Sequence, residues 1–168
     1  MLALGLIIIG ILMRFLPHAP NFTPVAAIAL FGGAYLSKKH SMIVPLLLMI
    51  VSDIFIGMHN VIVFTWGSFI LVALLGILIK KNKKVSTVFF AGIGSSLLFY
   101  MISNFGVWLM GWYPNNAKGL LDSYIMGLPF LRDFTFATIL YSAVFFGAYE
   151  LIARLVKDTK FSRILLTN

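Results

Sequence analysis

Charged and amide side chains inside apolar segments are the residues of this sequence best suited to bind a solute. Asp53 lies within the apolar run LLLMIVSDIFIGMH, Arg14 ends the first apolar run, and Asn104 ends another. A charged side chain within a membrane segment costs roughly 2.5–3.5 kcal/mol on insertion scales. Such a residue therefore indicates either a binding role or an ion pair between helices. For Asp53, with Arg14 or Arg132 as its partner, both interpretations stay open.

Other polar and aromatic residues lie at the ends of the apolar segments, at the same predicted level as Asp53. The predicted ligand-binding residues are Arg14, His18, Asn21, Asp53, His59, Trp66, Asn104, Trp108, Arg132 and Asp133. In this set the arginines attract negative charge, Asp53 and Asn104 orient the ligand, and the tryptophans cover its flat part. No metal site is predicted, because only Asp53 offers a third ligand beside the two histidines.

The stretch RFLPHAPNFTPVAA is more specific than a simple connection between two helices requires. Thr23 is a suitable helix cap, and Pro24 suits the first helical position. The free N–H groups at such a helix start can hold an anion. We therefore expect this stretch to form one wall of an outward-facing pocket.

Composition decides the broad class of the protein. The chain has 168 residues, of which 61% are hydrophobic and only 11% are charged, whereas soluble domains carry about 25% charged residues. We therefore predict a single integral membrane domain over residues 1–168, of the all-α class. The chain has no cysteine, which excludes disulfides and thiolate metal sites. It also lacks the hydrolase, zinc-protease and phosphate-loop motifs, so no catalytic residue, no enzyme activity and no cofactor is predicted.

The apolar segments predict six membrane helices. They cover residues 1–16, 24–36, 42–58, 61–79, 85–106 and 134–156. The first reads as a retained helix, because no basic segment or cleavage site accompanies it. The second is short for a span of roughly 20 residues, so either it extends over residues 37–39 or its outer end stops inside the protein. Residues 107–133 are predicted as an outer loop, with a short helix over 120–128.

Basic residues predict the orientation of the helices. Lys and Arg cluster at residues 38–39, 80–84 and 154–163, which hold ten of the thirteen. With six helices, all three clusters fall on one side, as the positive-inside rule requires of cytoplasmic loops. We therefore predict that both termini are cytoplasmic and that the protein lies in a bacterial inner (plasma) membrane. Because the charge of +8 follows topology, nucleic acid is not a predicted partner.

Two further patterns concern helix packing. Ala26, Ala29, Gly32 and Gly33 form a surface of small residues, with Ala29 and Gly33 at the spacing that favours close contact between membrane helices. This surface packs either inside the chain's own bundle or against a partner helix. Glu150 precedes Arg154 by four residues, so a local ion pair is expected there.

Three stretches, RFLPHAPNFTPVAAIALFGGAYL, SDIFIGMHN and SNFGVWLMGWYP, resemble a family of small bacterial inner-membrane proteins of unknown function. That family is distantly similar to the substrate-binding S components of energy-coupling factor (ECF) transporters. The resemblance implies a six-helix bundle with a small-molecule site near the outer face. It also implies a coupling membrane protein with ATPases as partner. The first helix, with Ala3, Gly5 and Gly10, lacks the AxxxA docking motif, so the second helix would have to supply that surface.

The sequence therefore predicts a membrane-embedded substrate-binding component for uptake of a small polar or anionic solute, such as a vitamin, a precursor or a metal ion. The lipid bilayer and this small-molecule ligand are its predicted partners. The alternative is a structural or accessory subunit of a larger membrane complex. A carrier acting alone, with Asp53 as the titrating group, is a third interpretation.

Overall fold

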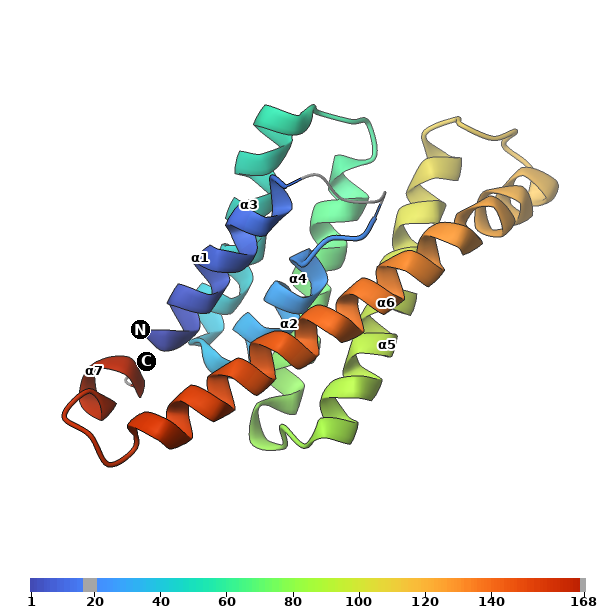
Figure 1. Cartoon of the computed structure of the whole chain (residues 1–168). Helices are drawn as coiled ribbons and strands as arrows, with labels where there is room; N and C mark the ends of the chain where they lie inside the picture. Colours follow the sequence, from blue (N-terminus) through green and yellow to red (C-terminus); the bar gives the residue numbers. More distant parts are fainter. Residues whose placement is uncertain (17–20, 167–168) are drawn as a thin grey trace.

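The computed structural model describes residues 1–16 and 21–166, and within them every regular element is helical. The helices are α1 (Leu2–Arg14), α2 (Val25–Tyr35), α3 (Lys38–Ile56), α4 (Ile62–Leu78), the 3-10 turn η1 (Ile79–Lys81), α5 (Val85–Leu109), α6 (Ala117–Val156) and α7 (Ser162–Leu166). From α1 to α6, successive helices run in opposite directions (Figure 1). This confirms the all-α class.

Four of these segments are long and apolar enough to cross a membrane. They are Lys38–Ile56, Ile62–Lys81, Val85–Leu109 and Ala117–Val156. The other two apolar helices are shorter, since α1 has 13 residues and α2 has 11. At about 1.5 Å per residue they reach ~20 Å and ~17 Å. The structure therefore supports a membrane protein, and the six-span topology stays a prediction.

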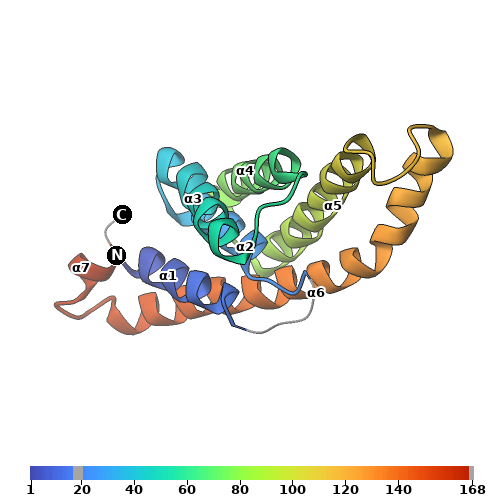
Figure 2. The same ribbon diagram turned by 90° about the horizontal axis from the view of Figure 1, so that it is seen from above.

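Helix α2 is the centre of the bundle. Every residue from Val25 to Tyr35 is buried, and α2 contacts α1, α3, α4, α5 and α6 (Figure 2). A helix that is apolar on all sides has no preferred outer face, which suits this position. Of the two predicted alternatives, the extension over residues 37–39 does not occur, because Ser37 caps α3 and Lys38 begins it. The outer end of α2, at Pro24 and Val25, is buried inside the protein.

The small residues of α2 serve this packing. Ala26, Ala29, Gly32 and Gly33 are all buried inside the chain's own bundle. Gly33 meets Gly76 of α4 so closely that a Cβ on Gly33 would collide with the carbonyl of Ala73, and one on Gly76 with that of Leu30. The surface is therefore occupied and offers nothing to a partner protein.

Helix α6 differs most from the sequence-based prediction. Residues 117–133, expected within a loop, form the first part of one 40-residue helix, and residues 107–109 complete α5. The Asn116 side chain caps α6 by accepting a hydrogen bond from Gly119 N at 2.8 Å. Pro129 lies inside the helix. Figure 2 shows α6 curving along its length, so that its first part lies beside α5 and its later part crosses α2.

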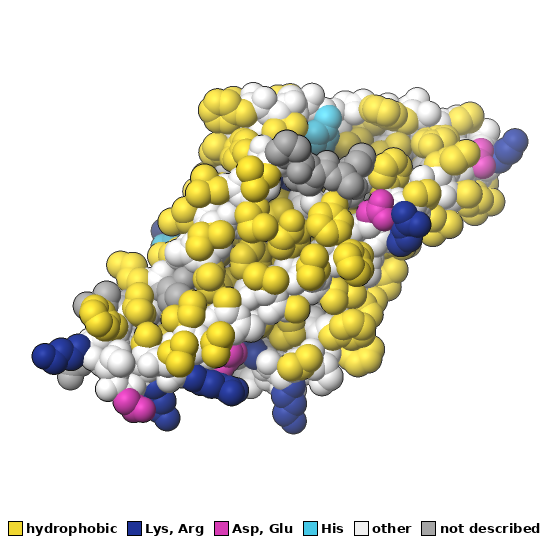
Figure 3. Space-filling model, in the orientation of Figure 1, with side chains coloured by type: hydrophobic (Ala, Val, Ile, Leu, Met, Phe, Trp, Pro, Cys, Tyr) yellow, Lys and Arg dark blue, Asp and Glu magenta, His cyan; other side chains and the backbone are white. Residues whose placement is uncertain are grey.

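The three basic clusters lie together at one end of the bundle. The start of α3, the η1–α5 turn and the end of α6 share this end in Figure 1, and basic side chains line the same edge in Figure 3. Lys80 donates a hydrogen bond to the carbonyl of Leu36 at 3.0 Å, which joins two of these connections. We call this the basic end. The opposite end, where α1 and α3 finish and α4 begins, we call the Asp53 end.

Candidate functional site: a cavity at the Asp53 end

Asp53 is the centre of a buried hydrogen-bond network. Arg14 Nη2 donates to Asp53 Oδ1 at 3.0 Å, and Trp66 Nε1 donates to Oδ2 at 2.8 Å. Arg14 Nε also donates to Ser52 Oγ at 2.8 Å. The side chains of Arg14 and Asp53 are only 12% and 4% exposed. A buried charge needs such compensation, and the network ties together the ends of α1 and α3 and the start of α4.

His59 borders this network without completing it. Its Nε2 lies 3.8 Å from Asp53 Oδ2, which is beyond hydrogen-bond distance. Its Nδ1 is buried and has no hydrogen-bond partner among the described residues. No group of three metal-ligating side chains is found in the described ranges, 1–16 and 21–166. His59 therefore lies next to the ion pair of Arg14 and Asp53 without a hydrogen bond to it.

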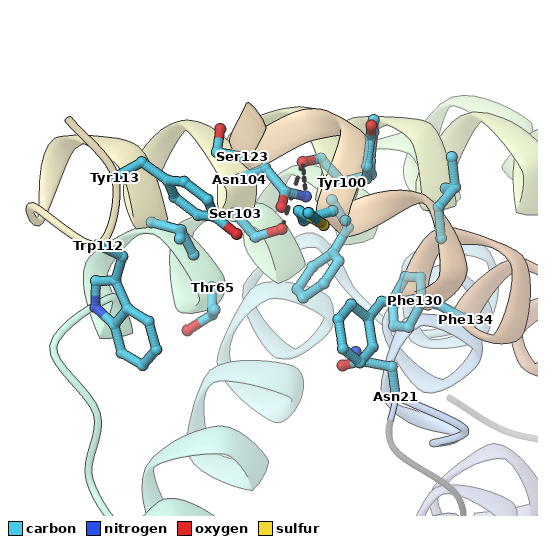
Figure 4. A pocket seen from close by; sticks show the side chains of 15 residues that line it. Asn21, Thr65, Tyr100, Ser103, Asn104, Trp112, Tyr113, Ser123, Phe130 and Phe134 are labelled. Carbon is cyan, nitrogen blue, oxygen red and sulfur yellow. Dashed lines mark hydrogen bonds between the residues drawn. The ribbon is translucent and has the colours of Figure 1, made fainter. Parts of the chain in front are cut away.

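A cavity of about 340 Å³ opens beside the network, between α4, α5 and the first part of α6. Figure 4 shows its side chains around one space, with Trp112 and Tyr113 on one side and Phe130 and Phe134 on the other. The lining residues are Asn21, Thr65, Phe99, Tyr100, Ser103, Asn104, Val107, Trp112, Tyr113, Ser123, Met126, Gly127, Phe130, Leu131 and Phe134. None of these side chains carries a formal charge.

Hydrogen bonds and close packing fix the α5–α6 wall of the cavity. Tyr100 donates to the Tyr124 carbonyl at 2.6 Å, and Tyr124 donates in return to the Met101 carbonyl at 2.9 Å. Asn104 Nδ2 donates to the Tyr100 carbonyl at 2.9 Å. A Cβ on Gly127 would collide with the Asn104 amide. Gly127 therefore lets α6 approach Asn104 closely.

Two features complete the other walls. Trp112 Nε1 donates to Asn60 Oδ1 at 3.2 Å, which holds the α5–α6 turn against the connection before α4. Asn21 adopts a positive φ of 60°, a conformation that asparagine tolerates better than most residues. Thr65, another lining residue, directly precedes Trp66 on α4, so the Asp53 network holds the helix that forms one wall.

The chemistry of the cavity follows from its lining. Hydroxyl and amide groups can donate and accept hydrogen bonds, and aromatic rings offer flat apolar faces. Mainly apolar walls with a few placed polar groups are typical of small-molecule sites. Such a lining suits a small, uncharged, partly planar solute.

The comparison with known families agrees with the sequence-based resemblance at its coarser level. Residues 1–161 match the family of unknown function DUF6580. The chain belongs to this family. No curated protein and no solved structure matches the chain. The DUF6580 family therefore accounts for nearly the whole chain and assigns no activity to it.

In this DUF6580 protein, the predicted site residues fall into separate groups. Arg14, Asp53 and Trp66 come together in the buried network, and His59 borders it. The pair of Arg14 with Asp53 is the one that the ion-pair interpretation named. Asn21 and Asn104 line the cavity. Asp53 itself is not among the lining residues, so the single pocket predicted around it is divided into a network and a neighbouring cavity.

The remaining predicted residues lie outside both groups. Arg132 Nε donates to Asp133 Oδ1 at 2.9 Å, and these side chains are 81% and 35% exposed. Trp108 Nε1 donates to the Pro114 carbonyl at 3.1 Å, and its side chain does not line the cavity. His18 lies outside the described residues. The expected convergence of Arg132 with Arg14 and Asp53 does not occur.

Most residues that line the cavity were not predicted from the sequence, although the helical spacing of these residues is visible there. On α5 the lining positions 100, 103, 104 and 107 share one helix face, and on α6 positions 123, 126, 127, 130, 131 and 134 do the same. The α6 pattern appears only when the helix is continued through Pro129. Glu150 also differs from expectation: it accepts a hydrogen bond from Tyr35 at 2.7 Å, and no ion pair with Arg154 forms among the described residues.

Proposed function

We propose that this protein is a membrane-embedded substrate-binding component that captures a small, neutral, polar solute for uptake. The observation that carries the proposal is the cavity of about 340 Å³ at the Asp53 end, with its uncharged hydroxyl, amide and aromatic lining. Because no side chain that lines the cavity is charged, the cavity favours a neutral polar solute over the anionic solute that Arg14 and Arg132 suggested. These two arginines are engaged with Asp53 and Asp133.

The direction of capture rests on the charge asymmetry of the bundle. Most of the residues that line the cavity belong to the start of α4, the later part of α5 and the first part of α6. The start of α4, the end of α5 and the start of α6 lie at the end opposite the three basic clusters (Figure 1), and Figure 3 shows basic side chains along the edge of those clusters. Cytoplasmic loops are those enriched in Lys and Arg, so the cavity opens toward the outer face of a bacterial plasma membrane. An outer small-molecule site is also what the resemblance to ECF S components implies.

In this proposal the Asp53 network has a positioning role. It holds Trp66 and therefore the start of α4, whose Thr65 faces the cavity. The ion pair fixes the cavity wall while the neutral side chains contact the solute.

Transport through an ATPase-driven coupling protein would need a docking surface other than the one predicted. The small residues of α2 are buried within the bundle, so neither a coupling protein nor a larger complex can dock on them. This removes the packing observation that supported the accessory-subunit alternative.

Thermal unfolding of the purified protein tests the proposal. Neutral vitamins, nucleosides and sugars are added singly, and a true ligand at 100 times its Kd stabilises the fold by about 2.7 kcal/mol. That corresponds to an increase in Tm of roughly 5–10 °C for a chain of this size. Met126→Trp, which fills the cavity from an exposed lining position, should abolish the increase.

The matched control is Ile125→Trp, because Ile125 is also exposed on α6 and does not line the cavity. It should respond to the ligand as the natural protein does. An equal loss of response in both variants contradicts binding in this cavity. A stable partner that lacks ATPase components, together with no response to any solute, favours the accessory-subunit function instead.

A further inference from the structure

A second hollow, of about 590 Å³, lies at the basic end, between the start of α5 and the last turns of α6. Val88 and Phe89 form its α5 wall, and Ile139 and Phe146 form its α6 wall. Phe89 is 44% exposed, so the hollow is a groove open at the bundle surface. In a membrane, this surface faces lipid.

The mouth of the groove carries an excess of positive charge. Lys83, Lys84 and Arg154 border it together with Glu150, so three cations and one carboxylate leave a net charge of +2. Lys83 donates to the Lys80 carbonyl at 2.8 Å and lies over the Tyr35 ring, while Glu150 accepts from Tyr35.

Two of these cations are available to a ligand. Within the described part of the chain, the Lys84 ammonium and the Arg154 guanidinium form no hydrogen bond or ion pair. A guanidinium and an ammonium are the side chains that bind phosphate best. They stand at the mouth of an apolar groove, so charge and shape together match an amphiphile with an anionic head.

Gly147 adds an observation on shape. Gly147 lies well inside the range of α6 and lines the groove, and a Cβ built on it meets nothing within 4 Å. Glycine inside a helix costs roughly 0.5–1 kcal/mol relative to alanine, and no contact within the chain requires it here. A ligand lying along the groove would use this space.

We propose that the groove binds one anionic phospholipid of the membrane leaflet at the basic end. Lys84 and Arg154 hold the phosphate, and one acyl chain lies along the wall formed by Val88, Phe89, Ile139 and Phe146. The site is independent of the solute cavity at the Asp53 end, because the two share no residue.

Native mass spectrometry in a neutral detergent tests this inference. Phosphatidylglycerol, phosphatidylcholine with the same acyl chains, and inorganic phosphate are titrated separately. Only phosphatidylglycerol should bind tightly. Each of Lys84→Gln and Arg154→Gln should weaken it about fivefold, and the double variant about 25-fold, since one cation near an anionic surface contributes on that scale. Lys81→Gln and Lys157→Gln, at the same end but outside the groove, should change nothing.

The acyl-chain contact is tested separately from the charges. Gly147→Leu should weaken phosphatidylglycerol binding at least tenfold without lowering Tm, whereas Gly5→Leu, at an exposed position of α1 with equal space, should leave binding unchanged. The proposal is overturned by equal binding of both lipids, by equal losses in the lysine controls, by binding of phosphate alone, or by a changed oligomeric state in Gly147→Leu.

Discussion

Asp53 and Arg14 form a buried ion pair across 3.0 Å, between the last turn of α3 and the last turn of α1. Trp66 donates a hydrogen bond to the same carboxylate, so α1, α3 and α4 are joined at the Asp53 end of the bundle. A charge pair in such a place also accounts for two residues that are costly in a membrane helix: they fix the start of α4, which forms one wall of the cavity.

Asp53→Ala should destabilise the protein by roughly 3–5 kcal/mol, because it leaves the Arg14 guanidinium buried without its counter-charge. Chemical unfolding in detergent measures this loss. The double variant Arg14→Met, Asp53→Leu should recover most of it. Asp133→Ala, which breaks the exposed pair with Arg132, should change stability by less than about 1 kcal/mol. Similar losses at Asp53 and Asp133 would refute the buried pair.

The contact between α2 and α4 should tolerate no side chain at its crossing point. Gly33→Ala and Gly76→Ala each place a methyl group against a backbone carbonyl of the other helix. We expect losses of roughly 1–3 kcal/mol or more, as for other overpacked cores. Gly67→Ala on α4, where a Cβ meets nothing within 4 Å, should be neutral or slightly stabilising. Thermal unfolding compares the three, and a neutral Gly33→Ala would contradict this crossing.

Pro129 should matter for binding more than for folding. It lies inside α6 just before the lining residues Phe130 and Leu131, where it removes one backbone hydrogen bond and favours a bend. Pro129→Ala should keep or raise Tm while abolishing the ligand-induced increase, because a straighter α6 displaces the cavity wall. A variant that binds solute like the natural protein would show that the bend does not shape the cavity.

Thiol labelling in intact cells tests the orientation, and the chain has no cysteine to give a background. Cysteines replacing Met58 and Asn115 at the Asp53 end should react with a membrane-impermeant reagent from outside. Cysteines replacing Lys39, Lys81 or Lys157 at the basic end should react only after permeabilisation. The reverse pattern would place the cavity on the cytoplasmic side and contradict uptake.

The buried network around Asp53 was partly predictable, because a charged residue inside an apolar segment indicates a partner. Asp53 requires a compensating partner wherever it is buried, and Arg14 and Trp66 are at the same end of neighbouring helices. The bounds of α2 were predictable from Thr23 and Pro24 at its start: residues 24–36 were predicted, and the helix runs from Val25 to Tyr35. Its central position was not predicted, because its small residues could equally have packed against a partner helix. The sequence alone could not decide between an ion pair and a ligand contact for Asp53, because both explain one costly carboxylate equally well.

The cavity was not predictable, because its wall depends on a proline inside a helix. Residues 107–133 were predicted as an outer loop with a short helix over 120–128, which ends just before Pro129; proline usually ends a helix in water. In membrane helices proline is tolerated, because the freed backbone groups are satisfied by neighbouring elements. Once α6 runs through Pro129, Arg132 and Asp133 become exposed neighbours on one helix and cannot meet Arg14.

The most direct measurement is a high-resolution cryo-EM map of the protein in lipid nanodiscs, bound to a rigid antibody fragment and saturated with the best stabilising solute. We expect compact non-protein density inside the α4–α5–α6 cavity, within contact distance of Tyr100, Asn104 and Trp112. An empty or collapsed cavity, or density continuous with a lipid acyl chain, would contradict solute binding at this site.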